Sequence, residues 1–118
     1  MLIGVPKEIK DNEYRVGLSP ESVQQLAARG HRVIVERDAG AGIGADDGDY
    51  RSAGATVVST AEEVFGESEL IVKVKEPLAR ERALLRRGQG LFTYLHLAPD
   101  PEQARGLLKS AGIAIAYQ

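Results

Sequence analysis

The sequence contains no cysteine, which excludes disulfide bridges, thiolate nucleophiles and the common structural zinc sites. It also lacks an excess of either charge, because 15 Lys and Arg stand against 17 Asp and Glu, a formal net charge of −2. Nucleic-acid-binding domains need a surplus of basic residues, so this balance argues against that class. No apolar run reaches the roughly 18–20 residues that span a bilayer, and no signal peptide is visible after Met1. We therefore expect a soluble cytoplasmic domain.

Short β-branched runs alternate with helical patterns along the 118 residues. At 43% hydrophobic and 27% charged residues, the chain has the composition of one globular domain with one core. The runs predict six strands, namely Leu2–Val5, Arg32–Glu36, Thr56–Val58, Leu70–Lys75, Gly90–His96 and Ile113–Tyr117. Most of these runs are apolar at successive positions, which is typical of a parallel sheet covered on both faces.

Helix-start signals lie between the predicted strands. Ser19 and Pro20 read as an N-cap followed by proline at the first helical position, and Gly30 can end that helix. Thr60 and Glu63 have capping-box spacing. Further helices are expected over 47–53, 80–87 and 100–111. The alternation predicts an α/β fold, with a doubly wound, mainly parallel six-stranded sheet and helices on both faces, and hence a Rossmann-like architecture.

In an open parallel sheet, ligands bind outside the carboxyl ends of the strands. Three polar residues come to that edge from distant parts of the sequence: Arg15 after the first predicted strand, Lys75 at the end of the fourth and His96 at the end of the fifth. They offer a two-pronged carboxylate binder, a point charge and a group that titrates near neutrality. This set predicts a small anionic substrate that carries a carbonyl or an amine.

Each of these residues also has a structural alternative. Arg15 follows three polar residues, the last of them Glu13, so a surface ion pair is one alternative. Lys75 can simply end its strand in solvent, and one of Lys73 and Lys75, which share a face, can mark an edge of the sheet. His96 lies between two leucines and can be structural. Convergence at one edge favours the functional interpretation.

The segment Gly40–Ala45 fits the glycine pattern G-x-G-x-x-A of dinucleotide-binding loops. It follows the second predicted strand rather than the first, and Asp46, Asp47 and Asp49 place negative charge where a pyrophosphate would lie. No acidic residue ends a strand about 20 residues further on, as the fingerprint requires. We interpret the segment as a turn that needs glycine backbone angles, and assign no cofactor-binding or metal-binding residue.

Three separated motifs resemble the alanine dehydrogenases. Met1–Ser19 (MLIGVPKEIKDNEYRVGLS) is similar to the start of that family, and Ile71–Pro77 (IVKVKEP) and Leu91–Ala98 (LFTYLHLA) are similar to two further signatures in the same order. Gly112–Tyr117 (GIAIAY) resembles the next strand of the family. The likeness extends from Met1 to Tyr117 with little interruption.

Alanine dehydrogenases interconvert L-alanine and pyruvate plus ammonia with NAD. The resemblance implies that Arg15 binds the substrate carboxylate, that Lys75 binds the carboxylate or the carbonyl oxygen, and that His96 contacts the reacting oxygen and transfers protons. It also implies NAD bound mainly by a second domain and a homo-oligomer, a hexamer in the family. We therefore expect residues 1–118 to be the N-terminal substrate domain, truncated before the NAD-binding domain and inactive alone, with neither nucleic-acid nor membrane partners.

Two alternatives stay open. The homologous first domain of the proton-translocating transhydrogenases tends to carry K-V-N-x-P where this chain has Lys73–Pro77, and it lacks the L-H-L-A run, so Lys75 and His96 favour the dehydrogenase. The chain can also be a non-catalytic remnant that only oligomerises. Expressing the 118 residues alone and measuring pyruvate binding by NMR separates these cases.

Overall fold

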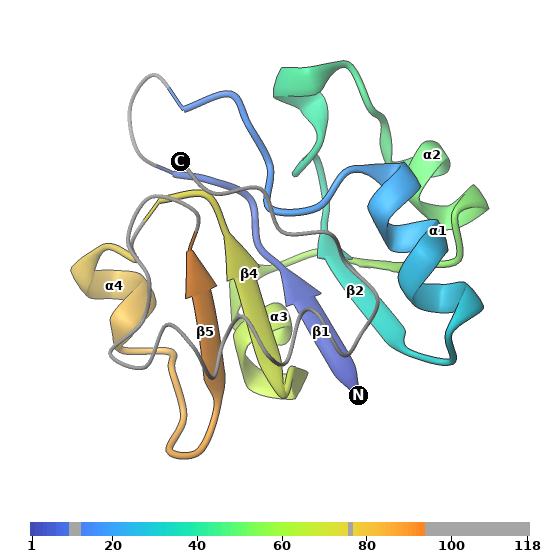
Figure 1. Cartoon of the computed structure of the whole chain (residues 1–118). Helices are drawn as coiled ribbons and strands as arrows, with labels where there is room; N and C mark the ends of the chain where they lie inside the picture. The colour runs from blue at the N-terminus through green and yellow to red at the C-terminus, as the bar shows by residue number, and fades with distance from the viewer. Residues whose placement is uncertain (10–12, 76, 94–118) are drawn as a thin grey trace.

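Strands and helices alternate along the chain in the computed structural model, which describes residues 1–9, 13–75 and 77–93 (Figure 1). The strands are β1 (Leu2–Val5), β2 (Arg32–Glu36), β3 (Thr56–Val58), β4 (Leu70–Lys73) and β5 (Gly90–Thr93). The helices are α1 (Pro20–Ala28), α2 (Asp47–Ser52), α3 (Ala61–Glu67) and α4 (Ala79–Arg82), with a single 3₁₀ turn, η1 (Ala41–Ile43), before α2.

The strands form one sheet in the order β3-β2-β1-β4-β5, and every neighbouring pair is parallel. Helices α1 and α2 lie on one face of this sheet and α3 lies on the other (Figure 1). The predicted doubly wound α/β fold is therefore confirmed over the described strands. The predicted sixth strand, Ile113–Tyr117, and the predicted helix over 100–111 lie outside the described residues.

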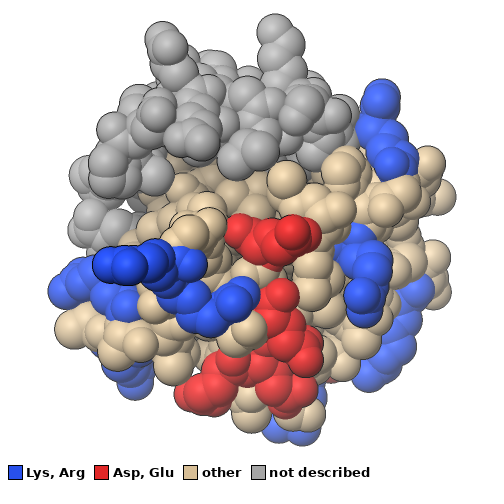
Figure 2. Space-filling model, turned by 90° about the horizontal axis from the view of Figure 1, so that it is seen from below, with Lys and Arg blue, Asp and Glu red and all other residues tan. Residues whose placement is uncertain are grey.

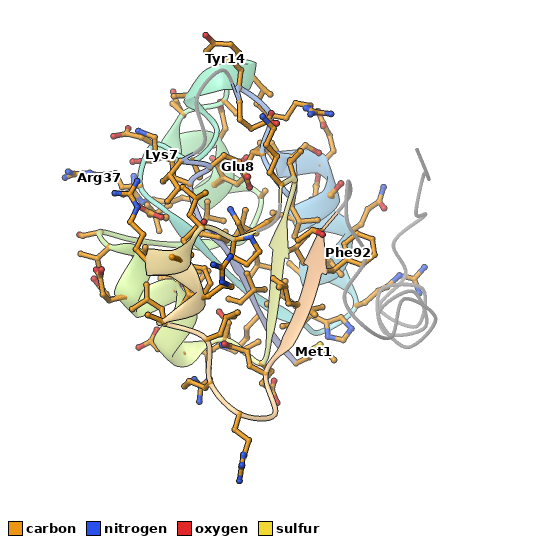
Figure 3. The ribbon with its side chains drawn as sticks, turned by 90° about the vertical axis from the view of Figure 1, so that its left-hand side faces the viewer. Met1, Lys7, Glu8, Tyr14, Arg37 and Phe92 are labelled. Carbon is orange, nitrogen blue, oxygen red and sulfur yellow. The ribbon has the colours of Figure 1, made fainter. Side chains whose placement is uncertain are left out.

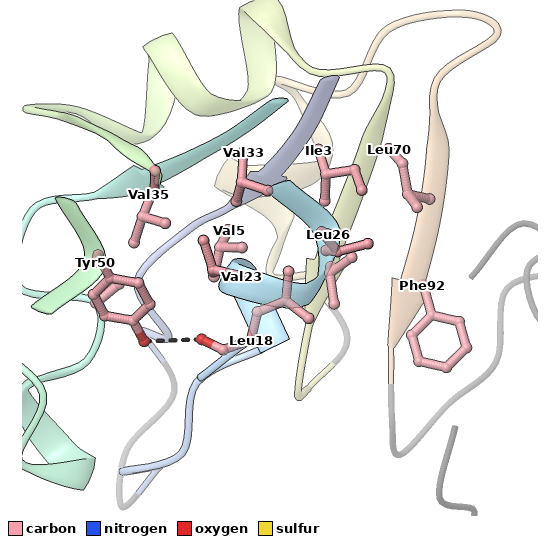
Figure 4. Packing of buried hydrophobic residues seen from close by; sticks show 13 residues of the cluster. Ile3, Val5, Leu18, Val23, Leu26, Val33, Val35, Tyr50, Leu70 and Phe92 are labelled. Carbon is pink, nitrogen blue, oxygen red and sulfur yellow. Dashed lines mark hydrogen bonds between the residues drawn. The ribbon is translucent and has the colours of Figure 1, made fainter. Parts of the chain in front are cut away.

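Alternate residues of the strands build a core on each face of the sheet. On one face, Ile3 and Val35 pack with Val23 and Leu26 of α1 (Figure 4). On the other face, Ile71 packs against α3. Full burial of one such aliphatic side chain contributes about 1.5–3 kcal/mol, so these two layers supply the main stabilisation of the sheet.

Two helices begin where their capping signals predict. The Ser19 hydroxyl oxygen accepts a hydrogen bond from the Ser22 N–H at 3.3 Å, and Pro20 is the first residue of α1. The Thr60 hydroxyl oxygen accepts from the Glu63 N–H at 3.2 Å at the start of α3. These bonds satisfy N–H groups that have no partner within a helix.

The helix predicted over Arg80–Arg87 is wrong in its length, because α4 ends at Arg82. The chain beyond α4 turns back toward the end of α3. There the Gln89 side-chain amide donates to the carbonyl oxygens of Phe65 and Ser68 at 2.6 and 2.7 Å. Arg86, inside the predicted helix, also donates from its Nη2 to the Ser68 carbonyl oxygen at 2.8 Å. The last carbonyls of a helix need such donors, and the segment after Arg82 provides them to α3.

One face of the molecule carries both acidic and basic side chains. Figure 2 shows acidic side chains between two groups of Lys and Arg side chains, so this face offers no continuous basic surface in the part that the structure describes. None of the helices in the described ranges is long and apolar enough to cross a membrane.

Candidate functional site

Strands β1 and β4 lie side by side in the sheet, and the chain leaves them in opposite directions. After β1 it goes to α1 and β2, whereas after β4 it goes to α4 and β5 (Figure 1). Such a point, where the strand order reverses, opens a crevice at the carboxyl ends of the strands. Arg15 follows β1 and Lys75 follows β4, so the topology brings both predicted site residues to this crevice.

Glu8 joins the segments that follow the two strands. Its Oε2 accepts a hydrogen bond from the Val74 N–H at 3.0 Å, and its Oε1 accepts from the Lys75 N–H at 3.2 Å. These N–H groups therefore bond to a side chain instead of a neighbouring strand. β4 consequently ends at Lys73, two residues before the predicted end at Lys75. Figure 3 shows Glu8 inside the molecule at this end, with Lys7 and Tyr14 toward the surface.

A buried ion triad lies beneath the crevice. The Lys73 Nζ lies 3.2 Å from Glu8 Oε1 and 3.2 Å from Glu81 Oε2, and only 1% of the Lys73 side chain is exposed. The remaining Glu81 oxygen accepts from the Leu78 N–H at 3.0 Å. Buried charges are tolerated when they are paired and hydrogen-bonded, as these are. The alternative that Lys73 marks a sheet edge is wrong, because β4 lies between β1 and β5.

Arg15 and Glu13 form a two-pronged ion pair. The Arg15 Nε donates to Glu13 Oε2 at 3.0 Å, and the Arg15 Nη2 donates to Glu13 Oε1 at 3.0 Å. The Arg15 backbone N–H adds a third bond to Oε2 at 2.8 Å. The hydrogen bond from the Arg15 side chain lowers the pKa of Glu13 below its usual value, and the same bond raises the pKa of Arg15. The surface ion pair expected as an alternative for Arg15 is therefore present.

Lys75 reaches the same carboxylate from the other side of the crevice. Its Nζ lies 3.7 Å from Glu13 Oε1, and 27% of its side chain is exposed. The structure thus brings Arg15 and Lys75 together on one shared carboxylate. The third predicted site residue, His96, lies outside the described residues.

A hollow of about 330 Å³ opens beside Arg15 at the carboxyl ends of β1 and β2. Two cations line it, Arg15 and Lys7, together with the acidic side chains of Glu8, Glu13 and Asp38. A larger hollow of about 490 Å³ between α1 and α2 has acidic but no basic lining residues. Of these two hollows, only the one beside Arg15 is lined by cations.

The glycine-rich segment after β2 does not fit a dinucleotide. A Cβ on Gly42 would lie 2.1 Å from the Tyr14 carbonyl oxygen, so this glycine allows close packing against the segment that carries Arg15. Gly44 has a φ of +78°, which glycine adopts without strain. The Asp46 carboxylate already accepts from the Asp49 N–H at 2.8 Å at the start of α2, where a pyrophosphate would need free N–H groups. The glycine-rich segment is therefore accounted for by close packing and by the turn before α2.

Sequence reasoning missed two acidic residues of this region, Glu8 and Glu81. One signal could have indicated them. Lys73 lies two residues after Ile71 in an apolar strand and therefore on the same face of the sheet. An ammonium group placed among buried residues requires a carboxylate partner. The sequence does not say which of the 17 acidic residues provides it.

The chain is similar to several known proteins. It is 51% identical over 118 residues to the alanine dehydrogenase of Bacillus subtilis, which covers 100% of this chain and 31% of that protein. A solved L-alanine dehydrogenase superposes with a TM-score of 0.78 at 52% identity, over 92% of this chain and 30% of that chain. The crystal structure of a transhydrogenase from Sinorhizobium meliloti superposes with a TM-score of 0.75 at 34% identity, over 95% and 32%.

These matches extend over most of the chain but only part of each relative. The chain spans about a third of the length of the curated relatives that it matches. The family model "Alanine dehydrogenase/PNT, N-terminal domain" matches residues 4–118. The resemblance expected from the three sequence motifs is thereby confirmed, and the chain belongs to the alanine dehydrogenase/PNT N-terminal domain family.

Proposed function

We propose that the chain is the substrate-binding part of an NAD-dependent oxidoreductase that interconverts L-alanine and pyruvate plus ammonia. One observation carries the proposal: Arg15 and Lys75, from loops 60 residues apart, meet on one carboxylate at the crevice between β1 and β4. Two cations at a strand-order reversal provide what a small carboxylic acid needs for binding. The family relationship supports the same assignment.

Arg15 is proposed to hold the substrate carboxylate. Its Nε–Nη2 edge is occupied by Glu13, which fixes the plane of the guanidinium. The Nη1–Nη2 end can then donate two parallel hydrogen bonds to a carboxylate that enters the hollow. A carboxylate held at two points keeps one face of the substrate Cα in a constant orientation, which accelerates any reaction at that carbon.

Lys75 is proposed to stabilise negative charge on the substrate oxygen. Its backbone is fixed by Glu8, while its ammonium carries donors beyond the contact with Glu13. An ammonium that faces the carbonyl oxygen of pyruvate stabilises the oxyanion that forms when ammonia adds. Proton transfer to and from the nitrogen and oxygen suits a group that titrates near neutrality, and His96 remains the predicted residue for this role.

NAD is proposed to be bound by a domain outside these 118 residues, where it accepts the hydride from the substrate. This part of the proposal rests on the resemblance to the alanine dehydrogenases and on the named relatives. A homo-oligomer, the hexamer that the resemblance implies, belongs to the same proposal and is measured by light scattering.

A chimeric enzyme tests the proposed activity. In it, the chain replaces the matching segment of the Bacillus subtilis alanine dehydrogenase, and alanine oxidation is followed through NADH absorbance. Lys75→Ala and His96→Ala are expected to lower turnover on the order of 10²-fold or more, as for residues that act on the reacting atoms. Lys7→Ala is the matched control, because Lys7 is an exposed cation of the same hollow that is assigned no role.

Near-normal turnover in both Lys75→Ala and His96→Ala overturns the proposed roles. A transhydrogenase domain is the second candidate, supported by the Sinorhizobium meliloti structure. For a transhydrogenase domain, whose substrates are nicotinamide nucleotides, pyruvate binding is not expected. Pyruvate binding by the 118-residue chain, followed by NMR shifts and abolished by Lys75→Ala, favours the dehydrogenase. A wild-type chain that does not bind pyruvate contradicts it.

A further inference from the structure

Lys73 and Lys75 lie two residues apart but reach different surroundings. In an extended strand, side chains two positions apart point to the same face of the sheet. Lys73 lies in the buried ion triad, with 1% of its side chain exposed. Lys75 instead reaches the crevice, where its ammonium lies 3.7 Å from Glu13 and 27% of its side chain is exposed. The backbone leaves the extended conformation between the two lysines, because β4 ends at Lys73 and the chain then bends at Val74 and Lys75.

The carboxylate of Glu8 lies at this bend. Its Oε2 accepts a hydrogen bond from the Val74 N–H at 3.0 Å, and its Oε1 accepts from the Lys75 N–H at 3.2 Å. Successive N–H groups of an extended strand point in opposite directions, so both reach one carboxylate only where the chain turns. Glu8 therefore stabilises the turn that directs the Lys75 side chain to the crevice.

Glu8 is itself held firmly in place. Besides the two N–H groups, the Lys73 ammonium lies 3.2 Å from Glu8 Oε1. Only 2% of the Glu8 side chain is exposed, so solvent competes little for its oxygens. Hydrogen bonds to an ionised acceptor are also stronger than those between neutral groups. The carboxylate is therefore a rigid support for the backbone of Lys75.

Glu81 binds the same ammonium but does not support this backbone. Its Oε2 lies 3.2 Å from Lys73 Nζ, and its other oxygen accepts from an N–H at the start of α4 at 3.0 Å. Among the described residues, no hydrogen bond joins Glu81 to the backbone of Lys75. Glu8 and Glu81 are thus similarly buried partners of Lys73, and only Glu8 contacts the Lys75 backbone.

We infer that Glu8 is a positioning residue for the proposed reaction, which holds the backbone after β4 so that the Lys75 ammonium lies at the crevice. The inference rests on the proposed function, because it takes Lys75 as the residue that stabilises charge on the substrate oxygen. A small displacement of a group that acts on reacting atoms lowers the rate steeply. Loss of Glu8 should therefore impair the reaction beyond its effect on the fold.

The kinetics of the chimeric enzyme, with pyruvate, ammonia and NADH as substrates, test this role. Glu8→Gln keeps the size of the side chain but removes its charge and one acceptor oxygen. Its kcat should fall on the order of tenfold, whereas KM for pyruvate should change less than about threefold, because Arg15 still holds the carboxylate. Glu81→Gln is the matched control, since it also removes a buried carboxylate beside Lys73, and its kcat should stay within about twofold of wild type.

A double variant shows whether Glu8 acts through Lys75. If it does, Glu8→Gln added to Lys75→Ala lowers kcat by no more than about twofold beyond Lys75→Ala alone. A second readout is the NMR spectrum of the 118-residue chain. There the amide signals of Val74 and Lys75 should shift in Glu8→Gln and stay nearly unchanged in Glu81→Gln, because only Glu8 accepts from these N–H groups.

The outcomes separate this inference from the proposed function. If Lys75→Ala lowers turnover but Glu8→Gln and Glu81→Gln have equal effects, the inference is overturned and the proposed function stands. A full additional loss in the double variant also overturns it, because Glu8 then acts independently of Lys75. Near-normal turnover in Lys75→Ala ends the proposed role of Lys75, and the inference fails with it. Should Glu8→Gln not fold, the triple variant with Lys73→Met and Glu81→Gln leaves no buried charge unpaired, and the same loss in kcat is expected of it.

Discussion

The ammonium of Lys73 lies 3.2 Å from a carboxylate oxygen of Glu8, a residue 65 positions earlier in the chain. Both side chains are almost completely buried. The pair connects the strand that ends beside Lys75 with the segment that leads to Arg15. The geometry of the candidate site therefore depends on a buried ion pair beneath it.

Removing the charge of Lys73 should destabilise the fold strongly. Lys73→Met keeps the length of the side chain but leaves the carboxylates of Glu8 and Glu81 buried without their cation, and we expect a loss of about 3–5 kcal/mol in urea unfolding. Adding Glu8→Gln and Glu81→Gln to Lys73→Met should restore much of this loss, because no buried charge remains unpaired. A loss below about 1 kcal/mol in the single variant contradicts this account of the triad.

Tyr50→Phe tests a buried hydrogen bond between the α2 side of the core and the start of α1. The Tyr50 hydroxyl donates to the Leu18 carbonyl oxygen at 2.8 Å (Figure 4). Its loss leaves a buried acceptor without a donor, so the free energy of unfolding should fall by about 1–2 kcal/mol. Tyr14→Phe is the control, because Tyr14 is exposed, and it should change stability little.

The buried Tyr50 also predicts that the stability of the fold depends on pH in the alkaline range. Burial raises the pKa of Tyr50 to about 12 from its ordinary value of 10.0. The folded chain therefore keeps this hydroxyl protonated at a pH where the unfolded chain loses the proton, and stability should fall as pH rises from 10.0 toward about 12. Tyr50→Phe should lack this part of the fall in urea titrations, and an identical alkaline profile in both proteins argues against it.

Gly17→Ala should disturb both stability and the candidate site. A Cβ at this position would lie 2.3 Å from the Val72 carbonyl oxygen, which belongs to β4 and cannot move freely. We expect a loss of about 1–3 kcal/mol, as for other overpacked positions, and weaker pyruvate binding because Arg15 lies two residues earlier. Gly66→Ala is the matched control: it lies in α3 with open space at its Cβ, and alanine should add about 0.5–1 kcal/mol.

Glu36 predicts a pH dependence in acid. Burial raises the pKa of this half-buried carboxyl group above its ordinary value of 4.5, so the folded state favours its protonated form. Stability from this group is present at low pH and is lost as pH rises through the raised pKa. Glu36→Gln still accepts from the Lys7 N–H and should raise Tm at pH 7 by roughly 1–4 °C, with no gain at pH 3.5. Glu67→Gln is the control, because it shows how much the loss of one exposed negative charge changes Tm.

Much of the fold follows from local sequence signals. The continuous apolar run around Ile71 is typical of a strand covered on both faces, and β4 is such a strand. Ser19 and Thr60 cap α1 and α3 because their hydroxyl groups lie where N–H groups need acceptors. The convergence of Arg15 and Lys75 could also be predicted, since parallel strands place their carboxyl ends at one edge.

Other features depend on contacts between distant segments and could not be predicted. The segment after α4 contacts the end of α3, where the Arg86 and Gln89 side chains donate to the carbonyl oxygens of Phe65 and Ser68. The burial of Lys73 depends on two carboxylates from different loops. A sequence shows that a lysine and several acidic residues exist, but the pairing is decided only when the strands and loops have packed.

The contact between Glu8 and the Val74 N–H spans 66 residues and joins the segments that follow β1 and β4. Non-local pairings of this kind form slowly compared with local helices, because a long stretch of chain must be closed first. In a partly folded chain, the Arg15 guanidinium and the Lys75 ammonium have therefore not yet come together, so the site for a carboxylic acid is not formed. Binding of a 2-oxo acid should therefore require the fully folded chain. A saturating concentration of the 2-oxo acid should then protect the chain from proteolysis, because a ligand that binds only the folded state shifts the equilibrium toward it.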